Sequence, residues 1–282
     1  MTTILSIQSA VAYGHAGNSS AVFPLQRLGV ETWPVYTVLF SNHTGYGATR
    51  GPLIPPADVR EVVLGIDDRG VLDRCDAVLS GYLGAPEMGQ TILEAVALVK
   101  QRNPGALYLC DPVMGDYGRG FFTRPGVAEF FRDNVVAAAD VMTPNLFELE
   151  FLTGLKVTSA AELVDAADAL RAMGPSTVLV TSAVGEDDQV MRMVAVDDQG
   201  AWQVETPLID RTFVGSGDLT SALFAARFMA GLPLPEVLEM TGASVYGILK
   251  TTMDSDSAEL TIVPAQEEIV NPSNTFKATR LR

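Results

Sequence analysis

A short segment that combines two glycines, an acid and a following apolar helical run is the most informative chemical feature of this chain. It reads Arg-Thr-Phe-Val-Gly-Ser-Gly-Asp and covers residues 211–218. Gly215 and Gly217 allow backbone conformations closed to other residues, so the N–H groups on either side of Ser216 can converge on an anion. Asp218 would lie at the positive end of a helix dipole. The pattern is typical of phosphoryl transfer, but it equally describes an ordinary loop that ends in a helix N-cap.

Short apolar runs that lead into polar residues recur elsewhere along the chain. They alternate with helical patterns, which is typical of an α/β fold with a mainly parallel sheet and helices on both faces. In such a fold the functional side chains gather beyond the carboxyl ends of the strands. Four of these ends carry polar residues, namely Gln8 with Ser9, Ser80 to Gly84 with Tyr82, Asp111 to Asp116, and Thr181 with Ser182.

The elements that must position these residues follow from the apolar periodicity. The expected strands are Ile4–Gln8, Trp33–Leu39, Ala77–Leu79, Leu107–Cys110, Val141–Met142 and Val178–Val180, and then a hairpin of Val190–Val196 and Trp202–Thr206. The expected helices are Asn18–Leu28, Ala85–Gln101, Asn145–Thr153, Ala160–Met173, Asp218–Met229 and Leu234–Thr251. Pro24 weakens the first of these helices unless it lies in the first turn.

The domain organisation follows from the absence of a linker or an internal repeat in the sequence. We therefore expect one domain that spans residues 1–282. Within it, residues 254–282 are expected to form a polar C-terminal tail with one short strand candidate, Leu260–Val263.

Two acids bracket the turn after the run Leu107–Cys110. Asp111 and Asp116 enclose Pro-Val-Met-Gly, and two acids on a tight turn can hold a divalent cation directly or through water. Asp111 could instead cap the turn before Pro112. We favour the metal site, because the acids recur beside other polar strand ends.

A helix is predicted to begin after Thr143. Asn145 is a plausible N-cap, and Glu148 completes a capping-box pattern three residues later. The same Glu148 could instead point into the cleft and organise metal-bound water. The residues by themselves leave both interpretations open.

Hydroxyl and aromatic side chains could form a pocket for an uncharged or aromatic ligand. Ser9 and Thr44 could donate hydrogen bonds and Tyr82 could stack, with His43 and Gly45 beside them. His15 and His43, the two histidines of the chain, have no metal-ligand spacing, and each taken alone is expected to be a loop residue.

Composition excludes several classes of function. The chain has 282 residues, 48% of them hydrophobic, and a net charge of −15, which argues against nucleic acid or an anionic membrane as the main partner. No P-loop motif and no membrane-length apolar run is present. Cys75 and Cys110 lie in apolar contexts and are expected to be buried thiols, and the N-terminus reads as a strand, so we expect a cytoplasmic protein.

Taken together, these motifs resemble the pyridoxal kinases of the ribokinase-like superfamily. The Gly-Ser-Gly-Asp element, residues 215–218, marks the superfamily. Three other segments are more specific to vitamin B6 kinases: Gly-His-Ala-Gly-Asn at 14–18, Ser-Asn-His-Thr at 41–44 and Ser-Gly-Tyr-Leu-Gly at 80–84. Cys-Asp-Pro-Val-Met-Gly at 110–115 and Pro144-Asn145 with Glu148 extend the resemblance over most of the chain.

The resemblance implies a ribokinase-like three-layer sandwich and ATP-dependent phosphorylation of pyridoxal at its 5′-hydroxymethyl group. It implies that Asp218 is the general base and that Gly215, Ser216 and Gly217 form the anion hole. It also implies magnesium, often a monovalent cation such as K⁺, and a homodimer. The implied pyridoxal contacts are Ser9, His43, Thr44, Gly45, Tyr82 and Asp218. The implied nucleotide and metal positions are Asp111, Asp116, Thr143, Asn145, Glu148, Thr181, Ser182, Arg211, Thr212, Phe213 and Val214.

The chain departs from the family pattern at one position, and two other functions remain open. Some bacterial relatives carry lysine where this chain has Thr181, so the nucleotide contacts there should come from hydroxyl groups. A hydroxymethylpyrimidine kinase of the same fold would use the same Asp218, and a protein that binds or senses a B6 vitamer without catalysis could retain the motif. A nicotinamide-dependent dehydrogenase is disfavoured, because Gly-x-Gly-x-x-Gly does not follow the first predicted strand.

Overall fold

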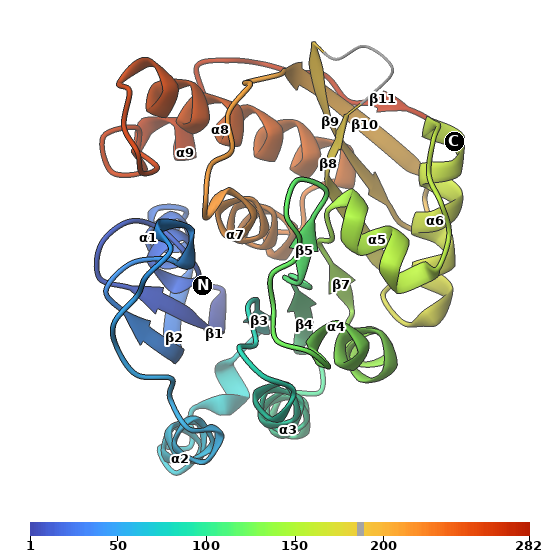
Figure 1. The fold of residues 1–282 in the computed structure, drawn as a ribbon. Coiled ribbons are helices and arrows are strands. Elements are labelled where there is room, and N and C mark those ends of the chain that lie inside the picture. The colour runs from blue at the N-terminus through green and yellow to red at the C-terminus, as the bar shows by residue number, and fades with distance from the viewer. Residues whose placement is uncertain (185–188) are drawn as a thin grey trace.

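A computed structural model of the chain describes residues 1–184 and 189–282, and its main feature is a nine-stranded sheet (Figure 1). The first six strands in spatial order are parallel to one another, and each of the last three runs antiparallel to the strand before it. In spatial order they are β2 (Glu31–Phe40), β1 (Thr3–Val11), β3 (Ala77–Ser80), β4 (Leu107–Cys110), β7 (Val141–Met142), β8 (Thr177–Val184), β9 (Val190–Val196), β10 (Ala201–Pro207) and β11 (Thr279–Arg280). The predicted mainly parallel sheet is confirmed.

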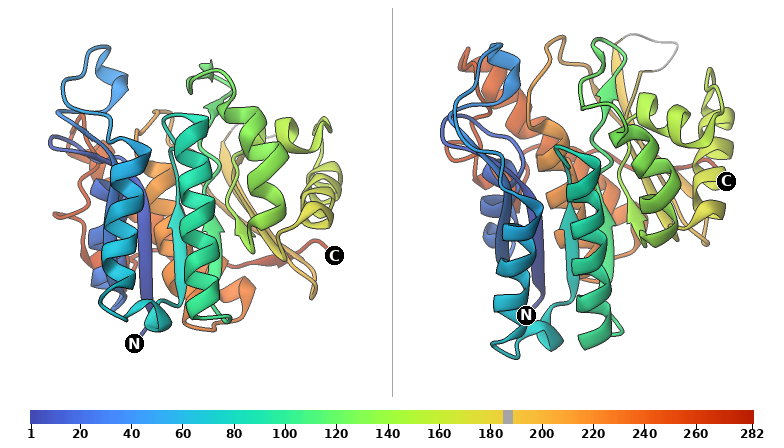
Figure 2. Two further views of the ribbon diagram at one scale, coloured as in Figure 1. Left: turned by 90° about the horizontal axis from the view of Figure 1, so that it is seen from below. Right: turned by 60° about the horizontal axis from the view of Figure 1, so that its bottom comes forward.

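Helices cover both faces of this sheet, as Figures 1 and 2 show. One apolar core lies under α1 (Asn18–Arg27), α7 (Ser216–Met229), α8 (Leu234–Asp254) and α9 (Glu267–Val270). The other lies under α2 (Pro56–Asp67), α3 (Pro86–Arg102), α4 (Val127–Phe130), α5 (Leu146–Thr153) and α6 (Ala160–Met173). Consecutive residues of a strand place their side chains in opposite cores, with Val78 and Tyr108 on one face of the sheet and Leu79 and Leu109 on the other. The strands are apolar on both faces for this reason.

The predicted elements differ from the structure mainly at their ends. The first strand is longer than expected and reaches Val11. Helix α1 begins at Asn18, so Pro24 lies beyond its first turn and yet the helix continues to Arg27. Packing explains this, because Pro24 is buried with Ala21 and Leu25 between the sheet and the neighbouring helices. Sequence reasoning missed helix α2 and the small hairpin β5 (Gly115–Asp116) and β6 (Gly120–Phe121).

The C-terminal segment corrects one prediction. Residues 260–263 do not form a strand, since 260 and 261 are irregular and a turn begins at 262, and the segment is more than a polar tail. Leu260 and Ile262 are buried in the core beneath α7 and α8, so their alternation reflects insertion between helices and not pairing in the sheet. Further along, β11 pairs with β10, and Arg227 of α7 donates to the carbonyl of Ile269 at 2.8 Å.

Both cysteines match the sequence prediction. Cys75 and Cys110 are free and buried. Loss of hydration raises the pKa of the Cys75 thiol to about 11 and that of Cys110 to about 12. In the part of the chain that the structure describes, no helix has the length and apolarity needed to cross a bilayer.

Candidate active site

The loops that follow the parallel strands gather at one edge of the sheet. In Figure 2 this edge faces upward, and the segment around the short 3-10 helix Thr44–Tyr46 and the β5–β6 hairpin project from it. Strands β1, β3, β4, β7 and β8 are parallel neighbours, so their carboxyl ends bring together residues that are far apart in the sequence. The N-terminus of α7 lies at the same edge, as the following contacts show.

The start of α7 requires glycine at its N-cap. Gly215 has a φ of 83°, and a Cβ there would lie 2.1 Å from the carbonyl oxygen of His15. Its own carbonyl accepts from Ser20 Oγ at 2.8 Å and from the Leu219 amide at 3.0 Å. The amides ahead of Leu219 belong to the first turn, where helix geometry offers no carbonyl four residues back. One of them, Ser216 N, is 3.4 Å from the carbonyl of Phe213.

Asp218 lies in this first turn and contacts the loop after β1. Its Oδ2 accepts a hydrogen bond from the Gly17 amide at 2.8 Å. A Cβ on Gly81, just after β3, would be 3.6 Å from Asp218 Oδ1. Loss of hydration raises the pKa of Asp218 to about 6, and the Gly17 hydrogen bond offsets part of that rise. Asp218 is therefore ionised at neutral pH but is a stronger base than an ordinary carboxylate.

Asp111 lies at the end of β4 and faces α7. Ser221 Oγ donates to Asp111 Oδ2 at 3.0 Å and also lies 2.7 Å from the hydroxyl of Thr143. The Asp111 side chain is buried, and loss of hydration raises its pKa well above the ordinary value. The charges of Glu148 and Asp218 raise it further, which shows that the three acids form one electrostatic centre.

Glu148 confirms the capping interpretation of the sequence. It completes a capping box with Asn145, because Glu148 Oε2 accepts from the Asn145 amide and Asn145 Oδ1 accepts from the Glu148 amide, both at 2.9 Å. The side chain is nevertheless buried, and its Oε1 accepts from the Met114 amide at 2.9 Å. Loss of hydration raises the pKa of Glu148 to about 7 against the effect of these amides. A cap residue is thus also part of the acidic centre.

Asp116, by contrast, is held by its own hairpin. Its Oδ2 accepts from Arg119 Nη2 at 2.6 Å, and the pair lies near the surface. Its charge still contributes to the raised pKa of Glu148. Among the described residues, no group of three or more histidine, cysteine, aspartate or glutamate side chains has the arrangement of a protein-only metal cage. The acids instead suit magnesium, which takes one or two carboxylates and completes its shell with water and phosphates.

The residues predicted for the aromatic ligand come from three loops around the start of α7. Ser9 is buried near the end of β1, and a Cβ on Gly17 would lie 2.4 Å from its Oγ. Tyr82 is half-buried beside Gly81, and burial raises its pKa. Gly45 lies next to the segment before α7, since a Cβ on it would be 3.4 Å from Val214 Cγ2. Of the other two, Thr44 is exposed, whereas only 11% of the His43 side chain is accessible.

The residues predicted for the nucleotide follow β7 and β8 and precede α7. The Thr181 amide donates to the carbonyl of Pro144 at 3.0 Å, so Thr181 lies beside the Thr143 loop. The register between β8 and β9 shifts between Val180 and Ala183, which places Thr181 and Ser182 in an irregular stretch. The Arg211 guanidinium lies over the Phe213 ring at 5.2 Å and donates to the Ser257 carbonyl. Thr212 is exposed.

Sequence reasoning overlooked residues that complete this centre. Ser221 could have been found, because it lies one helical turn after Asp218 and therefore shares its face. Gly17 and Gly81 matter through their backbone and through the close approach that glycine allows. Neither role has a local signal in the sequence.

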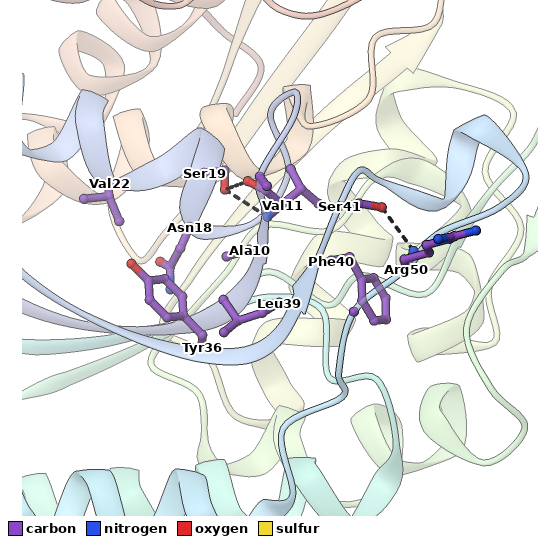
Figure 3. Close-up of a pocket in the computed structure, with 12 residues that line it drawn as sticks. Ala10, Val11, Asn18, Ser19, Val22, Tyr36, Leu39, Phe40, Ser41 and Arg50 are labelled. Atoms are coloured by element: carbon purple, nitrogen blue, oxygen red, sulfur yellow. Dashed lines mark hydrogen bonds between the residues drawn. The ribbon is translucent and has the colours of Figure 1, made fainter.

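A separate cavity of about 560 Å³ lies between α1 and the ends of β1 and β2 (Figure 3). Exposed Tyr36 and Leu39 of the edge strand line it, together with Asn18, Ser19 and Arg50. Asp111, Glu148 and Asp218 are not among its lining residues, so this cavity is distinct from the acidic centre.

The three-layer fold, with an acid at the glycine-rich start of α7, is that of a ribokinase-like kinase. A family model described as phosphomethylpyrimidine kinase matches residues 57–261. Pyridoxal kinase PdxY of Rubrobacter xylanophilus is 52% identical over 282 residues, which cover 99% of this chain and 97% of that protein. Pyridoxal kinase PdxY of Leifsonia xyli subsp. xyli is 52% identical over 280 residues, or 99% of each chain.

Solved structures agree with these relatives. Pyridoxal kinase from Leishmania donovani in complex with ADP and pyridoxine has a TM-score of 0.92 at 27% identity and covers 99% of both chains. The complex of the same kinase with ADP and pyridoxamine gives the same TM-score over 100% of both chains. The chain belongs to the pyridoxal kinase family.

Proposed function

We propose that this chain transfers the γ-phosphate of ATP to the 5′-hydroxymethyl group of pyridoxal and so makes pyridoxal 5′-phosphate in vitamin B6 salvage. The observation that carries the proposal is the Asp218 carboxyl, which lies in the first turn of α7 with a pKa of about 6 beside the loops after β1 and β3. Curated relatives at 52% identity carry the name pyridoxal kinase, and they match nearly the whole chain.

In this proposal Asp218 is the general base. It accepts the proton of the primary alcohol as the alcohol oxygen attacks the γ-phosphorus and the bond to the ADP oxygen breaks. The amides of Gly215, Ser216 and Gly217 and the α7 dipole stabilise the negative charge on the transferring group. Because the site draws on backbone donors, this charge stabilisation does not depend on a P-loop lysine.

We propose magnesium as the cofactor, held near Asp111, Asp116 and Glu148 through water, and K⁺ as a second ion. The fit rests on the raised pKa values of Asp111 and Glu148, since a nearby cation would favour the ionised carboxylates. When bound, magnesium would neutralise phosphate charge. Ser221 and Thr143 meanwhile keep the Asp111 carboxylate oriented.

The two substrates are assigned to opposite sides of Asp218. The pyridoxal contacts that we propose are Ser9, His43, Thr44, Gly45, Tyr82 and Asp218. The nucleotide contacts that we propose are Asp111, Asp116, Thr143, Asn145, Glu148, Thr181, Ser182, Arg211, Thr212, Phe213 and Val214. The two sets of loops approach one another at Gly45, where a Cβ would lie 3.4 Å from Val214 Cγ2, and this supports a site in which they meet.

The remaining parts of the proposal concern the whole molecule. We propose one kinase domain over residues 1–282, which acts in the cytoplasm as a homodimer. The exposed Tyr36 and Leu39 at the β2 edge of the sheet are consistent with a surface that a second copy could cover. Neither nucleic acid nor membrane is a proposed partner, given the net charge of −15.

The test is to incubate the purified protein with ATP and magnesium plus pyridoxal, pyridoxine, pyridoxamine or hydroxymethylpyrimidine, and to measure ADP and the phosphorylated product. ADP formation with pyridoxal is the expected result. Turnover of hydroxymethylpyrimidine alone would move the chain to the activity named in the matching family model. Binding of vitamers without ADP formation would identify a vitamer-binding protein and contradict the proposal.

A further inference from the structure

A carboxylate from the C-terminal segment reaches the loops assigned above to the vitamer. Glu259 Oε1 lies 3.0 Å from His43 Nε2 and accepts from the Tyr46 hydroxyl at 2.6 Å. Glu259 Oε2 accepts from the amide of His15 at 3.1 Å. Both oxygens are thus bonded to loops more than 200 residues earlier, since 216 positions separate His43 from Glu259.

The path of the chain after α8 delivers this carboxylate. Asp256 has a φ of 49°, which turns the chain at the end of the helix. Among the described residues, Asp256 is the one non-glycine residue with a positive φ. Ser257 Oγ then donates to the Glu259 carbonyl at 2.7 Å and accepts from the Glu259 amide at 3.2 Å. Leu260 follows in the core, so Glu259 is fixed from both sides.

Close approach on the other side of the carboxylate limits its freedom further. A Cβ on Gly14 would lie 2.2 Å from Glu259 Oε2, so the glycine leaves the space that the carboxylate fills. Only 11% of the Glu259 side chain is accessible. Arg211 donates to the nearby Ser257 carbonyl and joins the same segment to the loop before α7.

The contact with Glu259 determines how the His43 ring is presented. With the proton on Nε2, the ring donates to Glu259, and it stacks on Tyr46 with centroids 4.7 Å apart. Nδ1 is then an acceptor that is buried and has no hydrogen-bond partner among the described residues. It lies beside Gly45, where a Cβ would be 2.9 Å away. The ring nitrogen therefore faces the inside of the 43–45 turn.

We propose that Glu259 is a positioning residue for vitamer binding, which fixes the tautomer and orientation of His43 and ties the Tyr46 and His15 loops together. The inference rests on the proposed function, because the 43–45 turn is assigned there to the vitamer. Glu259 acts through His43 and does not touch the reacting atoms. Its loss should therefore weaken vitamer binding and leave the nucleotide side intact.

The first test is steady-state kinetics of the full chain with Glu259→Gln and Glu259→Ala. Glutamine keeps the volume but replaces one acceptor by a donor, so it cannot satisfy His43, Tyr46 and His15 together. We expect KM for pyridoxal to rise about 10-fold, the size of one lost hydrogen bond to a charged group. We expect kcat within ~3-fold and KM for ATP within ~2-fold of the wild type, as for lost uniform binding.

Glu267→Gln is the matched control. Glu267 is an acid of the same C-terminal segment, but it is exposed and pairs with Arg27 at the surface. It should leave both KM values unchanged. If Glu259→Ala does not fold, the test uses Glu259→Gln in a chain that also carries His43→Ala. In that His43→Ala background, Glu259→Gln should raise KM for pyridoxal by less than about twofold. A full additional increase would mean that Glu259 does not act through His43.

The second test does not depend on activity. His15 and His43 are the two histidines of the chain, so their side-chain ¹⁵N signals can be assigned with one variant. We expect the Nε2–H tautomer for His43 in the wild type and in Glu267→Gln, and a changed His43 signal in Glu259→Ala. An unchanged signal, or a changed signal with an unaltered pyridoxal KM, would overturn the inference. If the wild type phosphorylates no vitamer, the proposed function fails first, and the inference falls with it.

Discussion

Two regions of the molecule hold carboxyl groups away from bulk water, and they differ in what surrounds the charge. Asp111, Glu148 and Asp218 are surrounded by backbone amides and hydroxyls, and no lysine or arginine pairs with any of them in the described ranges. Loss of hydration dominates, and the pKa of each is raised. Glu259 instead bonds the imidazole of His43 and the phenol of Tyr46 through one oxygen and the His15 amide through the other.

The difference separates chemistry from positioning. The charges of Glu148 and Asp218 raise the proton affinity of Asp111, so the three acids form a centre suited to receiving a cation, and Asp218 among them can accept a proton. A carboxylate that bonds an imidazole and a phenol, as Glu259 does, holds those side chains in place. The acidic centre should therefore govern turnover and the Glu259 contacts should govern KM, and the following predictions can break that division.

The largest effect is expected for the proposed base. Asp218→Asn keeps the shape and an acceptor for the Gly17 amide but cannot take the alcohol proton. Since a positioned base contributes typically ~10²–10⁴-fold, kcat should fall by about that factor while ATP still binds. Single-turnover kinetics and nucleotide titration measure the two quantities. Near-normal turnover in Asp218→Asn would remove the acidic centre from the chemistry.

A smaller effect, on folding and activity together, is expected at Gly215. Its φ of 83° strains any other residue, and an alanine Cβ would lie 2.1 Å from the His15 carbonyl oxygen. Gly215→Ala should lower the free energy of unfolding by about 3 kcal/mol and distort the proposed anion hole. Urea unfolding and kcat report the two changes.

Gly29→Ala is the matched control for that variant. Gly29 has a φ of 80°, but no atom lies within 4 Å of a Cβ built there. Its replacement should cost about 1 kcal/mol, from backbone strain alone, with unchanged activity. Equal losses in the two variants would show that the approach of His15 to the start of α7 carries no additional energy.

Most of the acidic centre could be predicted from the sequence, because its residues follow from local patterns. Strand Leu107–Cys110 and helix Ala160–Met173 were predicted at their observed bounds, and parallel strands bring their carboxyl ends to one edge. Asp111 and Glu148 therefore had to lie near one another once the sheet was recognised. Ser221 needed only the helical repeat counted from Asp218.

The Glu259 contacts could not be predicted in the same way. They depend on the route of the chain after α8, where Asp256 turns it and Leu260 enters the core. The alternation of apolar residues at 260–263 looked like a strand, because a period of two does not reveal whether side chains pack on a sheet or between helices. Contacts across more than 200 positions have no local pattern.

The smallest of the three effects is on the stability of Asp218→Asn, which should rise although the activity of the same variant falls. Asp218 has a pKa of about 6 in the folded chain and Glu148 about 7, both above the ordinary values of 3.8 and 4.5. Between those values the folded state binds more protons than the unfolded state, so the free energy of unfolding falls as pH rises. For these two groups the loss begins near pH 4 and is complete about one unit above the folded pKa of Glu148, at pH ~8.

Asp218→Asn removes one of these two titrations. Without nucleotide or magnesium, we expect the variant to be more stable than the wild type by about 2 kcal/mol at pH 8, where the wild-type carboxyl is forced to ionise. Near pH 5 the gain should shrink to roughly half, since Asp218 is then largely protonated in the folded state. Urea unfolding at the two pH values measures this, with exposed Glu267→Gln as a control that should show no gain at either. A gain that is equal at both pH values would mean that the removed charge is not the cause, and the contrast between the acidic centre and Glu259 would lose its electrostatic basis.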